Sequence, residues 1–209
     1  MSAPIPIHLA VEDELSEGVA RRILRARGRD YAIGAVFGKS GAAYLKKRAA
    51  GFNSAALHCP FLLLADLDDR PCAPALLAEW LDRPRHEGFL LRVAVREVES
   101  WLLGDGDGLA RYLGCRRQRL PRDPEAVADP MRVLLELAEE SRFRRMRDAI
   151  VWRDPASGAL RQGPDYNGAL GQFVLEFWDF AAARARCPSL DRAWAALDRL
   201  EERHGRPSR

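Results

Sequence analysis

The sequence predicts an α/β fold: a mostly parallel sheet with helices on both faces, followed by a C-terminal helical extension. Short apolar runs alternate with amphipathic helical patterns through the first half of the 209 residues, which is typical of consecutive β-α-β units. One run, FLLLA at residues 61–65, is apolar throughout, as expected for a strand covered on both faces. From Leu109 onward the pattern is helical.

Four strands are expected in the first half, and helical patterns separate them. The strands are placed at residues 5–11, 31–37, 61–65 and 88–95. The first helix, over residues 14–27, has apolar side chains at the spacing of one helix face and basic residues opposite. Further helices are expected at residues 43–50 and 73–81, and from Glu97 onward.

The second half is expected to contain helices and two loops. The loops are placed at residues 121–130 and 154–164, and the last two helices at residues 168–186 and 190–203. Ser189 is a suitable N-cap for the final helix. We therefore predict a sheet domain over residues 1–115 and a helical extension over residues 116–209 that packs on the same core.

Composition restricts the class of protein. The chain has 33 Lys and Arg against 30 Asp and Glu, so the whole molecule is not a polycation. Its four cysteines stand apart from one another, which predicts reduced thiols in the cytoplasm rather than zinc ligands or disulfides. The N-terminal segment lacks the basic and apolar regions of a signal peptide, and no stretch approaches the ~20 apolar residues of a membrane helix. We expect a cytoplasmic protein with no membrane partner.

Carboxylates follow three of the four predicted strands. They form the clusters at residues 12–14, 66–69 and 97–99. Ligands of parallel sheets bind beyond the carboxyl ends of the strands, and adjacent carboxylates stay ionised most easily when they share a cation. Mg²⁺ suits such oxygen ligands, so a site for Mg²⁺ or Mn²⁺ is predicted. The attraction of helix N-termini for acids explains Glu14 and Glu17 well and can extend to Glu99, but it explains Asp66 and Asp68 poorly.

The order of these motifs resembles the Toprim fold of topoisomerases, primases and overcoming-lysogenization-defect (OLD) nucleases. In that fold a glutamate follows the first strand, as Glu12 does here, and a later strand ends in DxD, as in FLLLADLD. The segments VEDELSE, AVREVESWLLGD, GPDYNGAL and CPSLDRAWAAL further resemble a bacterial Toprim-like family often encoded beside an ATPase. These segments span the chain from about residue 5 to 200.

The resemblance implies roles for individual carboxylates. Glu12 is then a metal ligand or general base, Asp66 and Asp68 are metal ligands, Glu97 completes the site, and Glu99 substitutes for it or binds a second metal. The activity implied is that of a Mg²⁺- or Mn²⁺-dependent nuclease in phage defence or repair. Nucleic acid, DNA foremost, is the implied substrate, and an ATPase encoded nearby is the implied partner.

Two other functions remain open. Toprim nucleases usually have glycine directly after the glutamate, whereas Asp13 follows Glu12 here. This departure favours a degenerate Toprim domain that serves as partner or regulator of an ATPase. FLLLADLDD also resembles the nucleophile motif of haloacid-dehalogenase-type phosphatases. Those enzymes usually carry it on the first strand with a later Lys, but no Lys follows Lys47.

Basic residues near the second predicted strand are candidates for nucleic-acid binding. Lys39 and Ser40 lie in a GKSG segment, which lacks the P-loop spacing. A flexible turn is an equal interpretation of this segment. Lys46 and Lys47 lie on the following helix and can face phosphates, although a solvated helix face also accounts for them.

Overall fold

A computed structural model describes residues 3–205. Its internal contacts divide the chain into two units, Met1–Val95 with Ser189–Arg209, and Arg96–Pro188. This division differs from the predicted boundary near residue 115, because the chain leaves the sheet earlier and the final helix returns to it. No helix among residues 3–205 is long and apolar enough to cross a membrane.

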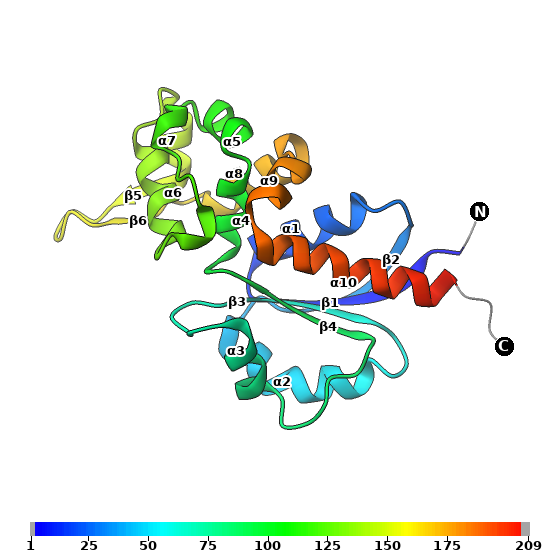
Figure 1. The fold of residues 1–209 in the computed structure, drawn as a ribbon. Coiled ribbons are helices and arrows are strands. Elements are labelled where there is room, and N and C mark those ends of the chain that lie inside the picture. Colours follow the sequence, from blue (N-terminus) through cyan, green and yellow to red (C-terminus); the bar gives the residue numbers. More distant parts are fainter. Residues whose placement is uncertain (1–2, 206–209) are drawn as a thin grey trace. The chain divides into compact units, whose positions relative to one another are not determined.

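The first unit contains a four-stranded sheet in which every neighbouring pair is parallel (Figure 1). The strands are β1 (Ile5–Val11), β2 (Tyr31–Gly38), β3 (Phe61–Asp66) and β4 (Phe89–Ala94), in the order β2-β1-β3-β4. The predicted parallel α/β sheet is therefore confirmed. Because all four strands run the same way, their carboxyl ends meet at one edge of the sheet.

Helices cover both faces of this sheet (Figure 1). One face carries α1 (Glu14–Arg25) and α10 (Pro188–Gly205), and the other carries α2 (Ala42–Ala55) and α3 (Ala73–Trp80). Side chains alternate between the faces along each strand. Leu91 and Val93 of β4 belong to the core beneath α2 and α3, so Arg92 between them faces α10. The alternation of side chains along β4 thus determines which residues pack beneath α2 and α3 and which face α10.

Arg27, just beyond α1, anchors α10 to the first unit. Its side chain is only 3% exposed and lies between two acids of α10. The Nε atom donates to Glu201 Oε1 at 2.7 Å, and Nη2 pairs with Asp198 and Glu201. The guanidinium also lies 3.9 Å from the ring centroid of Trp194. This buried, multiply bonded arginine explains why a helix at the far end of the sequence joins the sheet unit.

The second unit is mainly helical. Its elements are α4 (Val98–Gly104), α5 (Gly106–Leu113), η1 (Arg117–Arg119), η2 (Pro124–Ala126), α6 (Pro130–Glu139), α7 (Arg144–Ile150), β5 (Val151–Arg153), β6 (Leu160–Gln162), α8 (Tyr166–Gln172), η3 (Phe173–Phe177) and α9 (Phe180–Arg186). The predicted continuous helix over residues 168–186 is wrong. The chain breaks at Trp178 and restarts where Asp179 caps α9 by accepting from the Ala182 N–H.

Candidate metal site

Glu12 and Asp66 meet at the carboxyl edge of the sheet. Glu12 directly follows β1 and Asp66 ends β3, which pairs with β1 in parallel. The Asp66 backbone N–H donates to Glu12 Oε1 at 2.9 Å. Two of the acids singled out in the sequence are therefore brought together by strand pairing alone.

The Glu12 carboxyl group is strongly perturbed. Burial raises its pKa to about 7, and the negative charges of Asp68 and Asp13 act in the same direction. The hydrogen bond from Asp66 and the charge of Arg70 oppose this rise. Burial dominates because removing a carboxylate from water disfavours its charged form. A carboxyl group that titrates near neutral pH can exchange a proton under physiological conditions.

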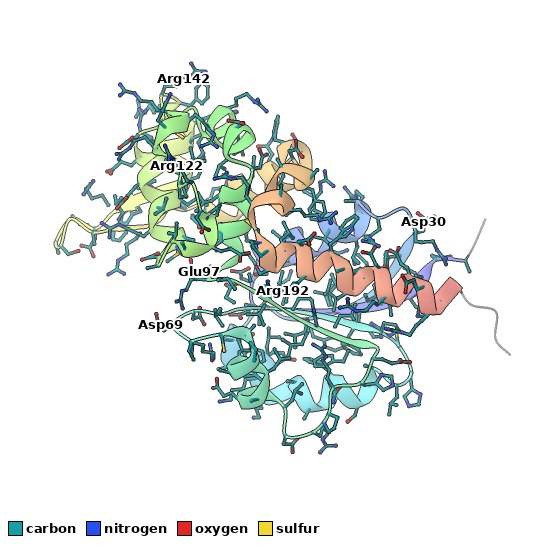
Figure 2. The ribbon with its side chains drawn as sticks, viewed as in Figure 1. Asp30, Asp69, Glu97, Arg122, Arg142 and Arg192 are labelled. Carbon is teal, nitrogen blue, oxygen red and sulfur yellow. The ribbon has the colours of Figure 1, made fainter. Side chains whose placement is uncertain are left out.

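Asp68 lies in an exposed loop that has a left-handed turn. Its φ is 50°, a conformation that Asp tolerates better than most residues. The preceding Leu67 is buried and donates its N–H to the Ala94 carbonyl at 2.9 Å, which fixes the start of the loop. Arg70 Nη1 lies 3.3 Å from Asp68 Oδ2. Asp69, labelled in Figure 2, is exposed in the same loop.

Glu79 of α3 forms ion pairs with two basic side chains near this loop, Arg70 and Lys46. Arg70 Nε pairs with Glu79 Oε2 at 2.8 Å, and Lys46 Nζ with Oε1 at 2.7 Å. Arg70 and then Lys46 lower the pKa of Glu79 to about 2. The sequence interpretation did not include Glu79 or Arg70, because their pairing joins α2, α3 and the loop after β3 across the fold.

Asp13, which directly follows Glu12, has a structural role at the start of α1. It is the N-cap of α1, and its Oδ1 accepts from the Ser16 N–H at 2.7 Å. Its backbone is extended, with φ −150° and ψ −171°, which any residue can adopt. Glycine is therefore not required after Glu12, and Asp13 instead supplies an acceptor for the helix end.

The backbone of the GKSG segment hydrogen-bonds to the backbone of Val11 and Glu12. The Lys39 N–H donates to Val11 O at 2.9 Å, and the Gly41 N–H to Glu12 O at 3.1 Å. Gly38 has φ +104°, and a Cβ there would lie 2.0 Å from Val11 O. Glycine is obligatory at this close approach. The segment is thus a built turn that supports Glu12, and whether it also binds phosphate stays a prediction.

The predicted nucleic-acid-binding lysines differ in their surroundings. Lys39 Nζ pairs with Glu17 Oε2 at 2.6 Å, and Lys46 pairs with Glu79 as described above. Ser40 and Lys47 are exposed. Two of the three lysines therefore have their charge balanced by a carboxylate within the first unit. This pairing makes them weaker candidates for binding phosphates.

Glu97 and Glu99 belong to the second unit. Glu97 is the N-cap residue of α4, and its Oε2 accepts from the Met131 N–H at 3.0 Å. Glu99 is 6% exposed and accepts from the Tyr166 hydroxyl at 2.8 Å. These contacts give both acids a place in the second unit's own structure. Their membership of the metal site stays a prediction.

The donor chemistry at the edge fits a hard cation. Glu12, Asp66 and Asp68 offer only carboxylate oxygens, the ligands that Mg²⁺ and Mn²⁺ prefer. The charge of Asp68 raises the pKa of Glu12, and this repulsion would be relieved by a shared ion. Among residues 3–205, however, no group of three or more His, Cys, Asp or Glu side chains is gathered closely enough to hold a metal. For Asp68 to join a metal site, its carboxylate would have to leave Arg70.

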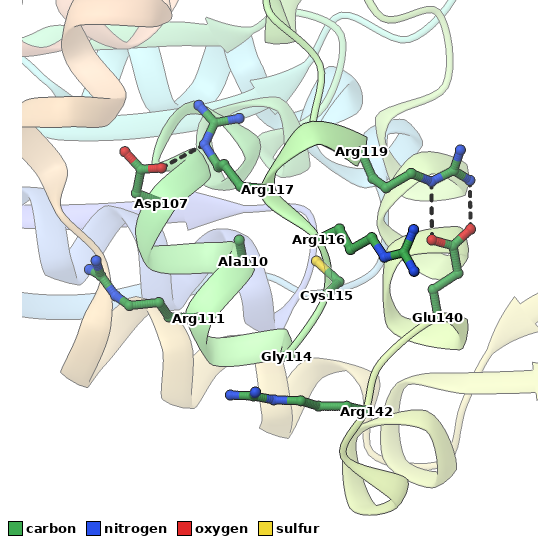
Figure 3. Close-up of a pocket in the computed structure, with 10 residues that line it drawn as sticks. All are labelled: Asp107, Ala110, Arg111, Gly114, Cys115, Arg116, Arg117, Arg119, Glu140 and Arg142. Carbon is green, nitrogen blue, oxygen red and sulfur yellow. Dashed lines mark hydrogen bonds and ion pairs between the residues drawn. The ribbon is translucent and has the colours of Figure 1, made fainter.

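The second unit has an open groove of about 1030 Å³ that is rich in arginine (Figure 3). Its arginines are Arg111, Arg116, Arg117, Arg119 and Arg142. Arg117 pairs with Asp107, and Arg119 binds Glu140 through two hydrogen bonds. Sequence reasoning did not single out this groove, although the dense arginines of RYLGCRRQR were a usable signal.

Similarity to known proteins is distant. No family model and no curated protein sequence matches this chain. Among solved structures, the chain is similar to the C-terminal region of the Burkholderia pseudomallei OLD protein, with a TM-score of 0.46 and 19% sequence identity. The alignment covers 91% of this chain and 98% of that one. A likeness at this TM-score assigns neither a family nor a functional site.

Proposed function

We propose that this chain is a Mg²⁺- or Mn²⁺-dependent nuclease that hydrolyses phosphodiester bonds in nucleic acid, DNA foremost. The observation that carries the proposal is the half-buried Glu12 carboxyl group against the Asp66 backbone, with a pKa raised to about 7. Such perturbed groups concentrate at functional sites. This one lies at the sheet edge where parallel α/β folds bind their ligands.

The residues at this edge divide into cation ligands and a proton acceptor. Asp66 and Asp68 are the proposed ligands, and Glu12 serves as a further ligand or as the general base. The bound ion supplies charge stabilisation for a scissile phosphate and lowers the pKa of a water molecule. Glu12 is suited to accept a proton because its pKa lies close to neutral pH. Asp68 lies in an exposed loop, so its carboxylate has room to move from Arg70 to the bound ion.

The motif order of the sequence supports the same proposal. Glu12 after the first strand and Asp66 with Asp68 after a later strand resemble Toprim nucleases. Asp13 no longer weakens that resemblance, because its extended backbone and capping role explain the missing glycine. An ATPase partner, and a role in phage defence or repair, follow from the resemblance and are part of this proposal.

Cleavage of plasmid DNA and labelled oligonucleotides tests the activity. The wild-type chain should cut with Mg²⁺ or Mn²⁺ and should not cut in EDTA. Glu12→Gln and Asp68→Asn should each slow cleavage by about 100-fold or more. The neighbouring exposed acid provides the matched control, so Asp69→Asn should cut at the wild-type rate. Circular dichroism verifies that all variants are folded. Cleavage in EDTA, or wild-type rates for both site variants, would contradict the proposal.

A non-catalytic partner of an ATPase is the second candidate. It is favoured by the contact between Arg70 and Asp68 and by the absence of a gathered three-residue metal group in residues 3–205. If the chain with metal is inert both alone and with its neighbouring ATPase, this candidate becomes the better one. The chain should then alter the partner's ATP hydrolysis, and Glu12→Gln should alter it to the same degree as wild type.

A further inference from the structure

Helix α10 lies along the edge strand β4 in the opposite direction. At its start, Ser189 Oγ accepts from the Val95 N–H at 3.3 Å, just past the end of β4. Near its end, Arg203 Nη2 donates to Glu87 O at 2.8 Å, just before β4 begins. Figure 1 shows α10 across this face of the sheet. The segment between these anchors therefore lies alongside β4.

Arginines gather between these two anchors. The set, called the arginine track below, is Arg85, Arg92, Arg192 and Arg199. Arg92 faces α10 from the middle of β4, and Arg85 Nη1 lies 3.4 Å from the Leu91 carbonyl of the same strand. Arg192 (labelled in Figure 2) and Arg199 are seven residues apart, so they share one face of α10.

The charges that act on Arg92 come from the other three arginines of the track, and no acid is among them. Arg92 is half-buried, and its buried Nε has no hydrogen-bond partner among residues 3–205. Burial and then the charges of Arg85, Arg199 and Arg192 lower the Arg92 pKa to about 10. The acids Asp198 and Glu201 lie on another side of α10, where they bind Arg27. These two acids therefore neutralise Arg27 rather than the track.

An external anion would stabilise this group of arginines. The buried Nε of Arg92 has no hydrogen-bond partner among residues 3–205, which is costly, and the like charges of the four arginines repel one another. The α-helical rise puts Arg192 and Arg199 about 10 Å apart along the axis. A ligand with phosphates at regular intervals matches this spacing and can engage both side chains in extended conformations. Guanidinium groups bind phosphate through two parallel hydrogen bonds.

We propose that the arginine track binds the phosphodiester backbone of a nucleic-acid strand and directs it to the carboxyl edge of the sheet. The choice of nucleic acid over another polyanion rests on the proposed nuclease function. The contact between Ser189 and Val95 places the start of α10 at that edge, where Glu12 and Asp66 meet. The track thereby provides phosphate-binding side chains. Lys39 and Lys46 are less suited to this role because they are paired with Glu17 and Glu79.

Binding without metal tests the track separately from catalysis. Fluorescence anisotropy in EDTA would measure the affinity of a labelled single-stranded oligonucleotide. The double variant Arg192→Gln/Arg199→Gln should bind about tenfold or more weakly. The slope of log K against log salt should also become shallower, by about 0.7 for each phosphate that the variant no longer binds. The matched control is Arg25→Gln/Arg48→Gln, two exposed cations on α1 and α2 that are not part of the track, and it should bind as wild type.

Several outcomes would overturn the proposal. These are wild-type binding by the track variant, an equal weakening in the Arg25/Arg48 control, or a weakening confined to Arg111→Gln/Arg116→Gln in the second unit's groove. Competition by polyglutamate as effective as by unlabelled oligonucleotide would instead indicate an acidic protein partner. Failure of the nuclease proposal is seen separately, as intact binding with no cleavage when Mg²⁺ is restored.

Arg92→Met provides a second, independent measurement. Replacing the half-buried Arg92, whose Nε lacks a partner, by an apolar side chain should raise the thermal unfolding midpoint of the nucleic-acid-free protein by roughly 2–4 °C. The same variant should weaken oligonucleotide binding. A lowered midpoint would show that Arg92 is a structural residue and would contradict its role in the track.

Discussion

Glu12 shows how a single residue acquires chemistry from its place in the fold. The end of β1 puts its carboxyl group into a half-buried position beside β3, where burial raises its pKa to about 7. The neighbouring groups shift this pKa in opposite directions. The Asp66 N–H favours the carboxylate, whereas the charges of Asp68 and Asp13 disfavour it. In the absence of a cation, the ionised form of Glu12 is therefore destabilised.

This shift predicts a pH-dependent stability that belongs to Glu12. The folded chain keeps a proton that the unfolded chain loses between the ordinary pKa of 4.5 and about 7. The free energy of unfolding should therefore fall over that interval by up to about 3 kcal/mol. Glu12→Gln removes the effect, so in EDTA it should match wild type near about pH 4.5 and exceed it at about pH 8. Urea unfolding measures this, and a difference independent of pH would contradict it.

Residue-scale prediction from sequence succeeded where strand order determines position. Glu12 and Asp66 were expected together because parallel strands end at one edge, and they share a hydrogen bond. Arg70 and Glu79 were missed because their pairing depends on the path of the loop after β3. Arg92 was also missed, since one arginine within a strand pattern does not reveal which helix will cover it.

At the scale of elements, the turn after β2 supports the site through its backbone. Gly38 and Gly41 both have positive φ, but only Gly38 is closely packed. Gly38→Ala would bring a Cβ against Val11 O, whereas Gly41 has no atom within 4 Å of such a Cβ. The turn thus contains one glycine required by packing and one required by conformation alone.

This difference predicts unequal costs for two alanine substitutions. Gly41→Ala should lower the free energy of unfolding by about 1–3 kcal/mol, because φ 78° with ψ 176° is a region essentially restricted to glycine. Gly38→Ala should cost more, about 3 kcal/mol or above, because conformational strain and a backbone clash combine. Urea unfolding of both variants provides the comparison. Equal decreases would show that the approach to Val11 is relaxed at little cost.

The elements themselves were predictable to different degrees. The strands follow from apolar runs and period-two patterns, and all four were placed within a few residues. The helix over residues 168–186 was not, because its apolar pattern continues across the break that Asp179 caps. Nor could the pattern show that α10 joins the first unit, since that depends on the buried Arg27 and its two distant acids.

At the scale of the whole molecule, the two units carry different parts of the proposed function. The first contains Glu12, Asp66, Asp68 and the arginine track, while Glu97 and Glu99 have their described contacts in the second. The net charge of +3 gave no sign of a binding surface. A small net charge conceals the track because acids on other faces balance its arginines in the total.

The central claim is that the carboxylates at the sheet edge hold a divalent ion. Crystals soaked in Mn²⁺ would show the ion directly by its anomalous scattering. We predict a peak bonded to at least two of Glu12, Asp66 and Asp68, at about 2.0–2.2 Å when Mg²⁺ replaces it. The Asp68 carboxylate should turn from Arg70 toward the ion. Full Mn²⁺ saturation with no peak at this edge would contradict the claim.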